Sequence, residues 1–127
     1  VVLNESNCSF NQADRDHNRL RNVLSHLEKN YKHNINMDKV AEAANLSVPA
    51  FCNYFKKMTG ETYTDFVNDF RVNKACNLLL LNKSILDICF ETGFANHSYF
   101  SRVVKKFKGK TPTEFKNDIL TKKSTFN

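Results

Sequence analysis

The 127-residue sequence predicts an all-α protein of about seven helices. Apolar residues recur at helical spacing along most of the chain, and short polar breaks separate these runs. Only three glycines and two prolines are present, which argues against an all-β or a Rossmann-type fold. Apolar residues make up 41% of the chain, enough to build a core. No apolar run of about 18 residues and no charged-then-apolar leader is found, so we expect neither a transmembrane helix nor a signal peptide.

The first half of the chain predicts three helices after a polar start. Residues 1–13 are polar and aperiodic, and we interpret them as a linker from a missing N-terminal domain, because the chain does not begin with methionine. A helix is predicted from Asp14 to about Tyr31. Asn36 can then cap a short helix. A tight turn at "NLS" leads to a further helix that ends at Gly60.

The second half predicts a long linker helix followed by three shorter helices. The linker helix is expected over residues 62–82, about 20 residues or roughly 30 Å long. Its predicted buried side comprises Tyr63, Phe66, Val67, Phe70, Ala75, Leu78 and Leu79. Ser84 and Asp87 resemble a capping box at the start of the next helix, with Asp in place of the usual Glu. A helix from His97 to Lys108 and a last helix complete the chain. The first of these has a predicted buried face that comprises Tyr99, Phe100, Val103, Val104 and Phe107.

Two segments of the chain resemble each other at an offset of 48 residues, which becomes 49 after one extra residue in the second turn. The matched pairs are Asn36 with Ser84, Val40 with Ile88, Phe51 with Phe100, Lys56 with Lys105, Lys57 with Lys106 and Gly60 with Gly109. Each segment contains a short helix, a tight turn and a second helix, which is the helix-turn-helix pattern. Gly93 is predicted to supply a positive φ in the second turn.

The repeat predicts two helix-turn-helix subdomains, over residues 14–61 and 83–127, joined by the linker helix over residues 62–82. This arrangement is a homeodomain-like helix-turn-helix repeat. In such a motif the first helix supports the second, and the outer face of the second helix enters the major groove of DNA. A structural duplication that binds no ligand is the alternative interpretation.

The basic charge is concentrated at the end of the chain. The net charge is +6, and residues 96–127 carry eight basic side chains against two acidic ones, whereas the rest of the chain is balanced. A polyanion is the natural partner for such a patch, although a solvated surface is the simpler explanation of a lysine run. The four cysteines form no CxxC pair, which predicts free thiols in a reduced cytoplasm.

The segment "SILDICFETGFANHSYFSRVVKKFKGKTPTEFK" resembles the signature of the AraC/XylS family of bacterial transcription regulators. Upstream, "VAEAANLSVPAFCNYFKKMTG" and "DFRVNKACNLLL" are similar to the first helix-turn-helix and the linker helix of that family. The resemblance runs from about Arg15 to Ile119. The departures are Val104 in place of Phe, Lys108 where an aromatic residue is common, Asn53 where Arg is frequent, and Pro49 near the start of its helix.

The resemblance implies a cytoplasmic bacterial transcription regulator that binds double-stranded DNA sequence-specifically. Its two recognition helices are expected to enter successive major grooves, about 34 Å apart, from a single chain. RNA polymerase is the second partner that the family implies, and a small-molecule effector is expected to act only through a missing N-terminal domain. No cofactor, no metal ion and no membrane partner is expected.

Eight residues are predicted to read bases: Val48, Pro49, Cys52, Asn53, His97, Ser98, Ser101 and Arg102. Arg102 can donate two hydrogen bonds to guanine, and Asn53 can bind adenine in a similar bidentate way. Pro49 and Cys52 offer apolar contact to thymine methyl groups. We therefore expect the first subdomain to read fewer bases by hydrogen bonds than the second.

Seven residues are predicted to contact phosphates: Asn36, Lys56, Lys57, Ser84, Lys105, Lys106 and Arg71. The lysines lie one to two helical turns beyond the base-reading faces, where they position the protein without specifying sequence. The helix N-termini at Asn36 and Ser84 offer N–H groups to phosphate. A solvated surface charge is the alternative for each lysine, and an ion pair that holds the linker helix is the alternative for Arg71.

Two other classes of protein stay open as alternatives. The sequence gives an enzyme little support, because it holds no glycine-rich phosphate loop, no HExxH motif and no Cys/His pair at helical spacing. Some DNA-alkyl-repair proteins carry this kind of domain beside a reactive cysteine, but Cys8 has no companion cysteine nearby. The second alternative is a basic helical protein-interaction module without sequence-specific DNA binding. Steep salt dependence together with base preference distinguishes DNA binding from it.

Overall fold

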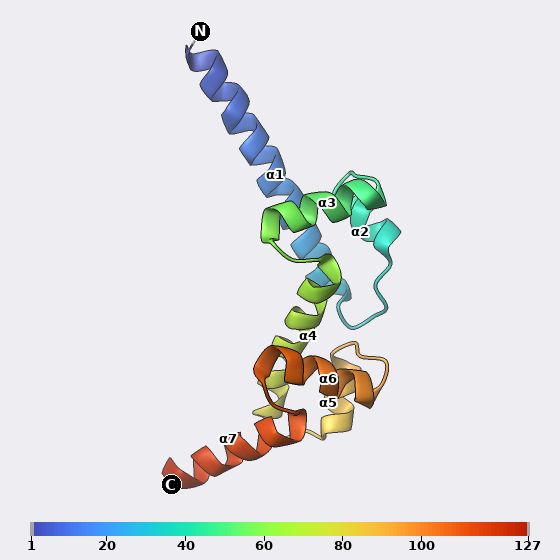
Figure 1. The fold of residues 1–127 in the computed structure, drawn as a ribbon, viewed down its shortest axis with the longest axis vertical. Helices are drawn as coiled ribbons and strands as arrows, with labels where there is room; N and C mark the ends of the chain where they lie inside the picture. The colour runs from blue at the N-terminus through green and yellow to red at the C-terminus, as the bar shows by residue number, and fades with distance from the viewer. Residues whose placement is uncertain (1, 127) are drawn as a thin grey trace. The chain divides into compact units, whose positions relative to one another are not determined.

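The structure, a computed structural model, describes the backbone of residues 2–126 and the side chains of residues 14–121 (Figure 1). Over residues 2–126 it contains seven α-helices and no strand, which confirms the predicted all-α fold. The helices are α1 (Val2–Asn30), α2 (Met37–Ala43), α3 (Val48–Thr59), α4 (Tyr63–Leu79), α5 (Ile85–Glu91), α6 (His97–Lys108) and α7 (Pro112–Phe126).

Helix α1 begins at Val2, where the sequence predicts an aperiodic segment up to residue 13. The sequence pattern did not reveal this part of the helix, because the few apolar residues before Asp14 do not recur at helical spacing. Its role as a linker from another domain stays a prediction. The side chains of residues 1–13, Cys8 among them, and those of Lys122 and Lys123 lie outside the described residues.

The chain folds into two compact units. The first unit contains the chain up to Asn30 together with Ile35–Tyr63, and the second contains Tyr31–Asn34 together with the chain from Thr64 onward. Most of α4 therefore belongs with the second helix-turn-helix, where the sequence predicts a separate connecting helix.

The core of the first unit is built on an aromatic cluster. Phe51 and Phe55 of α3 are fully buried, and their ring centroids lie 5.3 and 5.2 Å from that of Tyr63. On the rim of this unit, the Tyr54 hydroxyl donates a hydrogen bond to the Asp16 carbonyl oxygen at 2.7 Å. Burial, with the Asp16 carboxylate nearby, raises the pKa of Tyr54, so the phenol remains a donor.

The two helix-turn-helix segments have matching elements, as the repeat predicts. Helices α2 and α5 have seven residues each, and α3 and α6 have twelve each. The latter pair ends at Gly60 and Gly109, with φ of 84° and 75°, where a side chain would be strained. Each of these glycines donates its N–H to a carbonyl of the last turn, at 2.8 Å. The turns before α3 and α6 contain Asn45 and Gly93, with φ of 58° and 94°, so the positive φ predicted for Gly93 is confirmed.

The two short helices begin differently. The Asn36 side chain accepts hydrogen bonds from the N–H groups of Asp38 and Lys39, which confirms the predicted cap of α2. Ser84 occupies the corresponding position of α5, but its hydroxyl makes no capping bond, so the predicted capping box is wrong. Asp87 carries one methylene fewer than the Glu that this motif uses, which shortens its reach toward the start of the helix.

Helix α4 is shorter than predicted and is not the longest helix. It has 17 residues, about 25 Å at 1.5 Å per residue, and ends at Leu79. Four of the predicted core residues are buried, namely Tyr63, Val67, Ala75 and Leu79. The other three, Phe66, Phe70 and Leu78, are only partly buried. Val72 is fully buried and joins Ile88, Phe100 and Val104 in the core of the second unit, which the linker-helix prediction missed.

Candidate nucleic-acid interface

Helix α6 has one buried face and one exposed polar face. Its first turn is capped by the Asn96 side chain, which accepts the N–H of Tyr99 at 2.8 Å. Three apolar side chains anchor the inner face, namely Phe100, Val103 and Val104. On the opposite face His97, Ser98 and Arg102 are exposed, and Ser101 is half-buried. The predicted polar face of α6 is therefore available to a ligand.

Arg102 is supported by Tyr99, one helical turn earlier. The Arg102 guanidinium carbon lies 5.8 Å from the Tyr99 ring centroid, within cation–π distance. The Tyr99 hydroxyl accepts a hydrogen bond from the amide of Asn68 on α4 at 2.9 Å, and Asn68 is itself buried. The sequence pattern assigns Tyr99 to the buried face, yet 36% of it is exposed. That assignment is wrong, and the signal that was available is the i, i+3 spacing of Tyr99 and Arg102.

Lysines gather at the C-terminal end of α6. Lys105 is exposed, and Lys106 forms an ion pair with Asp65 of α4 at 3.4 Å. Both side chains of that pair are largely solvent-accessible, at 63% and 43%, so the pair contributes little stability and a phosphate can compete for the ammonium. Lys108 donates to the Asn73 side chain at 2.9 Å. This end of α6 is thus strongly positive.

Helix α3 presents a similar but less polar face. The Ser47 hydroxyl accepts the N–H of Ala50, and Pro49 stands within the first turn, where its missing N–H costs nothing. Pro49, Cys52 and Asn53 are exposed, and Val48 is half-buried. Lys56 and Lys57 are exposed in the last turn.

The two predicted base-reading sets occupy equivalent positions. Residues 48, 49, 52 and 53 correspond to 97, 98, 101 and 102 at the offset of 49. On a helix these positions lie on one face. Both sets begin directly after the N-cap of their helix, Ser47 for α3 and Asn96 for α6. The outer faces of α3 and α6 therefore present the same four positions with different side chains.

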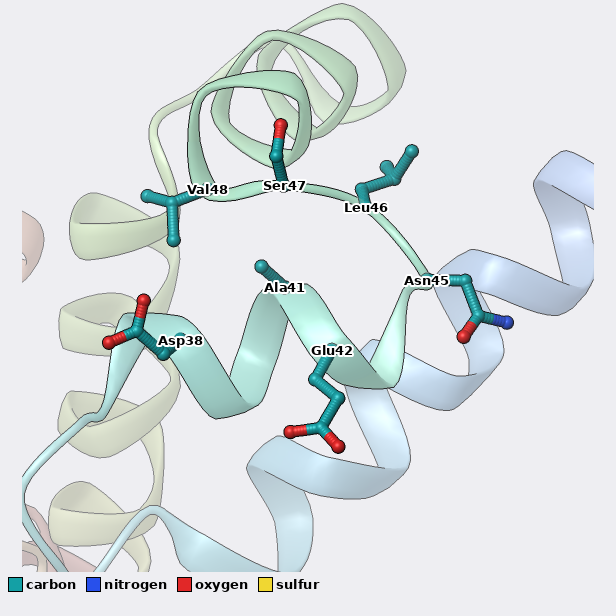
Figure 2. Close-up of a pocket in the computed structure, with 7 residues that line it drawn as sticks. All are labelled: Asp38, Ala41, Glu42, Asn45, Leu46, Ser47 and Val48. Atoms are coloured by element: carbon teal, nitrogen blue, oxygen red, sulfur yellow. The ribbon is translucent and has the colours of Figure 1, made fainter.

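A hollow lined by two acidic residues lies in the first helix-turn-helix (Figure 2). The second helix-turn-helix has no acidic residue at the corresponding positions of its sequence. The hollow has about 440 Å³ and lies between α2 and the start of α3, with the carboxylates of Asp38 and Glu42 along α2. At the offset of 48 the second segment has Leu86 and Phe90 at these positions. Two carboxylates repel phosphate, so the electrostatic attraction for a polyanion is weaker around α2.

The helix N-termini give mixed support to the predicted phosphate contacts. The Asn36 side chain already accepts from two N–H groups of α2, so a phosphate there competes with the cap. At α5 no side-chain cap bond is made, and Ser84 is exposed. The start of α5 is therefore the stronger of the two candidates.

Arg71 does not belong to the surface. It is only 8% exposed, and its Nε and Nη2 donate to the carbonyl oxygens of Tyr31 and His33 at 2.9 and 2.8 Å. A buried guanidinium whose donors bond to backbone carbonyls cannot reach a phosphate. This burial does not fit the phosphate contact predicted for Arg71, and the ion pair that holds the linker helix stays a prediction.

The described cysteines differ in exposure. Cys52 is exposed on α3, Cys76 is half-buried and Cys89 is buried. Burial raises the pKa of the Cys76 thiol, although Lys108 opposes the shift, and burial alone raises the pKa of Cys89. Among residues 14–121 no group of three or more His, Cys, Asp or Glu side chains is placed to hold a metal ion. No helix in that range is both long and apolar enough to cross a membrane.

Comparison with known proteins agrees with this geometry. Residues 40–118 match the sequence model of a family described as "Helix-turn-helix domain". A curated relative, an HTH-type transcriptional regulator in the cgkA 5′ region of Pseudoalteromonas carrageenovora, is 34% identical over 97 residues, 76% of this chain and 58% of the relative. The bifunctional transcriptional activator/DNA repair enzyme AdaA of Bacillus subtilis is 30% identical over 95 residues, 74% of this chain and 45% of AdaA. The chain thus spans about half the length of these relatives.

A solved structure is similar as well. It is the crystal structure of a transcriptional regulator from Chromobacterium violaceum, described among AraC-type DNA-binding domain-containing proteins. The two chains are 25% identical, with a TM-score of 0.73 over 80% of this chain and 91% of the other. The family match covers more than half of the sequence, and the repeated helix-turn-helix fits the structural neighbour. The chain therefore belongs to the AraC/XylS family of helix-turn-helix transcriptional regulators.

Proposed function

We propose that this chain reads the sequence of double-stranded DNA with the exposed faces of α3 and α6. The observation that carries the proposal is that the same four-position surface occurs twice, on two capped helices of equal length. In the second copy Arg102 is held over the Tyr99 ring. An arginine that only faced solvent would need no such aromatic support.

At α6, Arg102 is assigned to guanine. Its planar guanidinium donates two parallel hydrogen bonds to O6 and N7 in the major groove. Stacking on Tyr99 limits the rotamers of this long side chain, so less entropy is lost on binding. His97, Ser98 and Ser101 are short donors and acceptors for neighbouring bases.

At α3, Asn53 is assigned to adenine, through its amide oxygen and nitrogen. Pro49, Cys52 and Val48 offer apolar surface to thymine methyl groups. This copy has fewer hydrogen-bonding groups than α6 and lies beside the acidic hollow at Asp38. The half-site read by α3 is therefore expected to contribute less to affinity than the half-site read by α6.

Phosphates are assigned to the lysines that follow each recognition face: Lys56, Lys57, Lys105 and Lys106. No ion pair is described for the first three within residues 14–121, and that of Lys106 is exposed and weak. These contacts fix register and add affinity without sequence preference. The N-terminus of α5 at Ser84 is a further candidate, and that of α2 at Asn36 a weaker one.

The family supports the larger arrangement. We propose that the two recognition helices enter successive major grooves of one duplex, so that a single chain binds a bipartite, non-palindromic site. RNA polymerase is the proposed second partner, and the bacterial cytoplasm the proposed location. An effector is assigned to the part of the full protein that its longer relatives carry beyond this domain. Although AdaA is bifunctional, we propose no catalytic role for this chain.

The decisive experiment selects bound duplexes from a random pool of about 25 base pairs at 150 mM salt, with wild type, Arg102→Ala and Asn53→Ala. We expect two motifs about ten base pairs apart, one helical turn. Arg102→Ala should remove the preference for one guanine in one motif, and Asn53→Ala the preference for one adenine in the other, at a cost of about 1–3 kcal/mol each.

The two variants are controls for each other, because each should leave the other motif unchanged. Equal base preference in wild type and both variants contradicts the assignment. Recovery of no motif, with a shallow salt dependence, instead supports the alternative of a basic protein-interaction module.

A further inference from the structure

The second unit contains four residues that lie far before the rest of it in the sequence. Tyr31–Asn34 connect α1 to α2, both of which belong to the first unit, yet these four residues pack with the second. A connecting loop normally remains with the elements that it joins. The interactions that hold this segment in the second unit therefore need an explanation.

The backbone of the segment is held by a buried charge. Arg71 of α4 donates from two nitrogens to the carbonyl oxygens of Tyr31 and His33, at 2.9 and 2.8 Å. Its guanidinium carbon also lies 5.9 Å from the Phe94 ring centroid, just after the second turn. Burying an arginine is costly unless its donors are satisfied, so the two carbonyls are part of what stabilises it there.

The Tyr31 side chain of this segment packs against α4 as well. The Tyr31 ring meets the Phe70 ring edge to face, with centroids 5.3 Å apart. The Lys74 ammonium lies 5.6 Å from the Tyr31 ring centroid and 5.2 Å from that of Phe70. The segment is thus held through both its backbone and an aromatic ring.

Gly93 is shaped to the same segment. Its φ of 94° already disfavours a side chain, and a Cβ at this position would lie 2.2 Å from the Tyr31 carbonyl oxygen and 2.9 Å from Arg71 Nε. The first separation is far inside van der Waals contact. Gly93 is therefore required both for the turn and for the close approach of residue 31.

The internal repeat shows that these features are particular to the second copy. At the offset of 48, Arg71 corresponds to Val23 of α1, which is apolar and fully buried. Gly93 corresponds to Asn45, which has a φ of 58° and keeps its side chain. The first copy thus forms its turn without a buried arginine or a glycine. Arg71 and Gly93, the two residues that differ in the second copy, both lie against the carbonyl group of Tyr31.

We propose that Tyr31–Asn34 form a strap that completes the second helix-turn-helix, with Arg71 and Gly93 as positioning residues for DNA reading by α6. Phe94 follows Gly93 directly, and its ring centroid lies 5.0 Å from that of Phe100 and 6.1 Å from that of Tyr99. Tyr99 in turn supports Arg102. Through Arg71, Phe94 and Tyr99, the strap is therefore linked to the base-reading face of α6.

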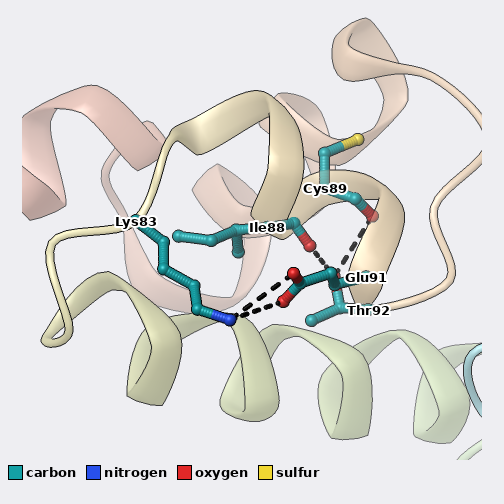
Figure 3. Close-up of polar contacts among 5 residues, drawn as sticks. All are labelled: Lys83, Ile88, Cys89, Glu91 and Thr92. Atoms are coloured by element: carbon teal, nitrogen blue, oxygen red, sulfur yellow. Dashed lines mark hydrogen bonds and ion pairs between the residues drawn. The ribbon is translucent and has the colours of Figure 1, made fainter.

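Figure 3 shows the polar contacts at the end of α5, just before Gly93. Thr92, immediately before Gly93, is buried and donates its hydroxyl to the Ile88 carbonyl at 2.7 Å, and Lys83 pairs with Glu91 at 3.2 Å. The Thr92 hydroxyl thus bonds to the last turn of α5 directly before Gly93.

The test exchanges the residue types of the two turns. Gly93→Asn tolerates a positive φ but adds the Cβ that collides with Tyr31, whereas the matched control Asn45→Gly alters the turn that has no strap. Arg71→Lys keeps the charge and loses the two-nitrogen geometry. Binding to duplexes altered in one half-site at a time is measured by fluorescence anisotropy, beside thermal unfolding of each variant.

The proposal rests on the proposed function, and we expect a selective effect. Folded Gly93→Asn and Arg71→Lys should bind about tenfold or more weakly, the loss caused by one misread base pair, and should lose preference only in the half-site that Arg102→Ala identifies. Asn45→Gly should bind as wild type does in that half-site. Wild-type preference in both half-sites, or equal loss in both, would overturn the strap. If Gly93→Asn does not fold, Arg71→Lys decides.

A second measurement separates the two proposals. Hydrogen exchange of the amides of residues 93–100 needs no DNA, and we expect it to be faster in Arg71→Lys than in wild type. Unchanged exchange overturns the strap whatever the DNA result. If wild type shows no base preference while exchange rises as expected, the proposed DNA reading fails and the strap stands.

Discussion

Single residues of this chain take roles that their position on a helical face does not reveal. Arg71 and Val72 are adjacent on α4 and both are buried, yet one bonds to two carbonyls and the other fills the core. Tyr99 lies next to the fully buried Phe100 and is nevertheless the support of an exposed arginine. Burial alone therefore does not separate packing residues from those that serve the interface.

Thiol reactivity tests the exposure of single residues on α3. In a Cys8→Ser chain, we expect Cys52 to react rapidly with a thiol reagent at pH 8 and Cys89 to react only on unfolding. The reactive species is the thiolate, and burial raises the pKa of Cys76 and Cys89, so their ionisation requires a higher pH than that of an ordinary thiol. Labelling is followed by mass spectrometry of peptides.

The same labelling reports on the proposed interface. A bound duplex should slow the reaction of Cys52 and leave that of half-buried Cys76 unchanged. Reaction of Cys89 as fast as that of Cys52 would contradict the structure, and lack of protection by a tightly bound duplex would place α3 away from the DNA.

At the scale of elements, the caps determine where each helix begins and ends. Asn96 starts α6 with a side-chain bond to Tyr99 at 2.8 Å, whereas Ser84 starts α5 without one. Both residue types are favoured at this position in sequence, so the sequence alone predicts equal caps. The backbone at the two capping residues differs, with φ of −59° at Ser84 and −151° at Asn96.

This difference predicts unequal effects of alanine. Asn96→Ala should lower the free energy of unfolding by about 1 kcal/mol, since it leaves an N–H of the first turn without its partner. Ser84→Ala, the matched control, should change it by only a few tenths. Urea unfolding followed by circular dichroism measures both. Equal losses would show that the Ser84 hydroxyl caps α5 in solution.

Much of the element order was predictable from sequence, for identifiable reasons. The caps at Asn36, Gly60 and Gly109 and the doubled apolar pattern locate α2, α3 and α6, because local chemistry fixes helix ends and periodicity marks buried faces. The extension of α1 to Val2 was not predictable from an apolar period. The hydrogen bond from Arg71 to the Tyr31 carbonyl oxygen was not predictable either, since a bond between residues 40 positions apart leaves no local sequence signature.

The candidate interface was predictable as a surface but not as an arrangement of contacts. Arg102 and Asn53 lie on the exposed faces that helical spacing assigns to them. Lys106 pairs with Asp65 through the tertiary packing of α6 on α4, which the sequence pattern does not show. Arg102 lies over Tyr99, which the sequence pattern wrongly assigns to the core. The base assignments themselves stay predictions.

On the scale of the whole molecule, charge is distributed unevenly. All of the net +6 comes from residues 96–127, and the first helix-turn-helix adds carboxylates at its acidic hollow. Counterion release therefore favours binding through the second helix-turn-helix. Affinity for any duplex, specific or not, should depend mainly on that part of the chain.

Salt dependence measures this imbalance. We expect the logarithm of the association constant to fall linearly with the logarithm of salt concentration, and Lys105→Ala to reduce the slope by about 1. Lys110→Ala is the matched control, because Lys110 lies beyond the end of α6 and is not among the predicted phosphate contacts, and it should change the slope less. Titrations of one duplex between 50 and 300 mM salt decide. An unchanged slope in Lys105→Ala would remove Lys105 from the phosphate contacts.

The equal lengths and matching glycine stops of α3 and α6 also bear on how such a protein diversifies. Each recognition face consists of four positions, three of them exposed, and each helix buries its own apolar residues on the inner face. Mutations at those positions disturb neither a core nor a cap. One copy can thus acquire a new base preference while the other retains its old one. A new operator can therefore arise by a change in one half-site at a time.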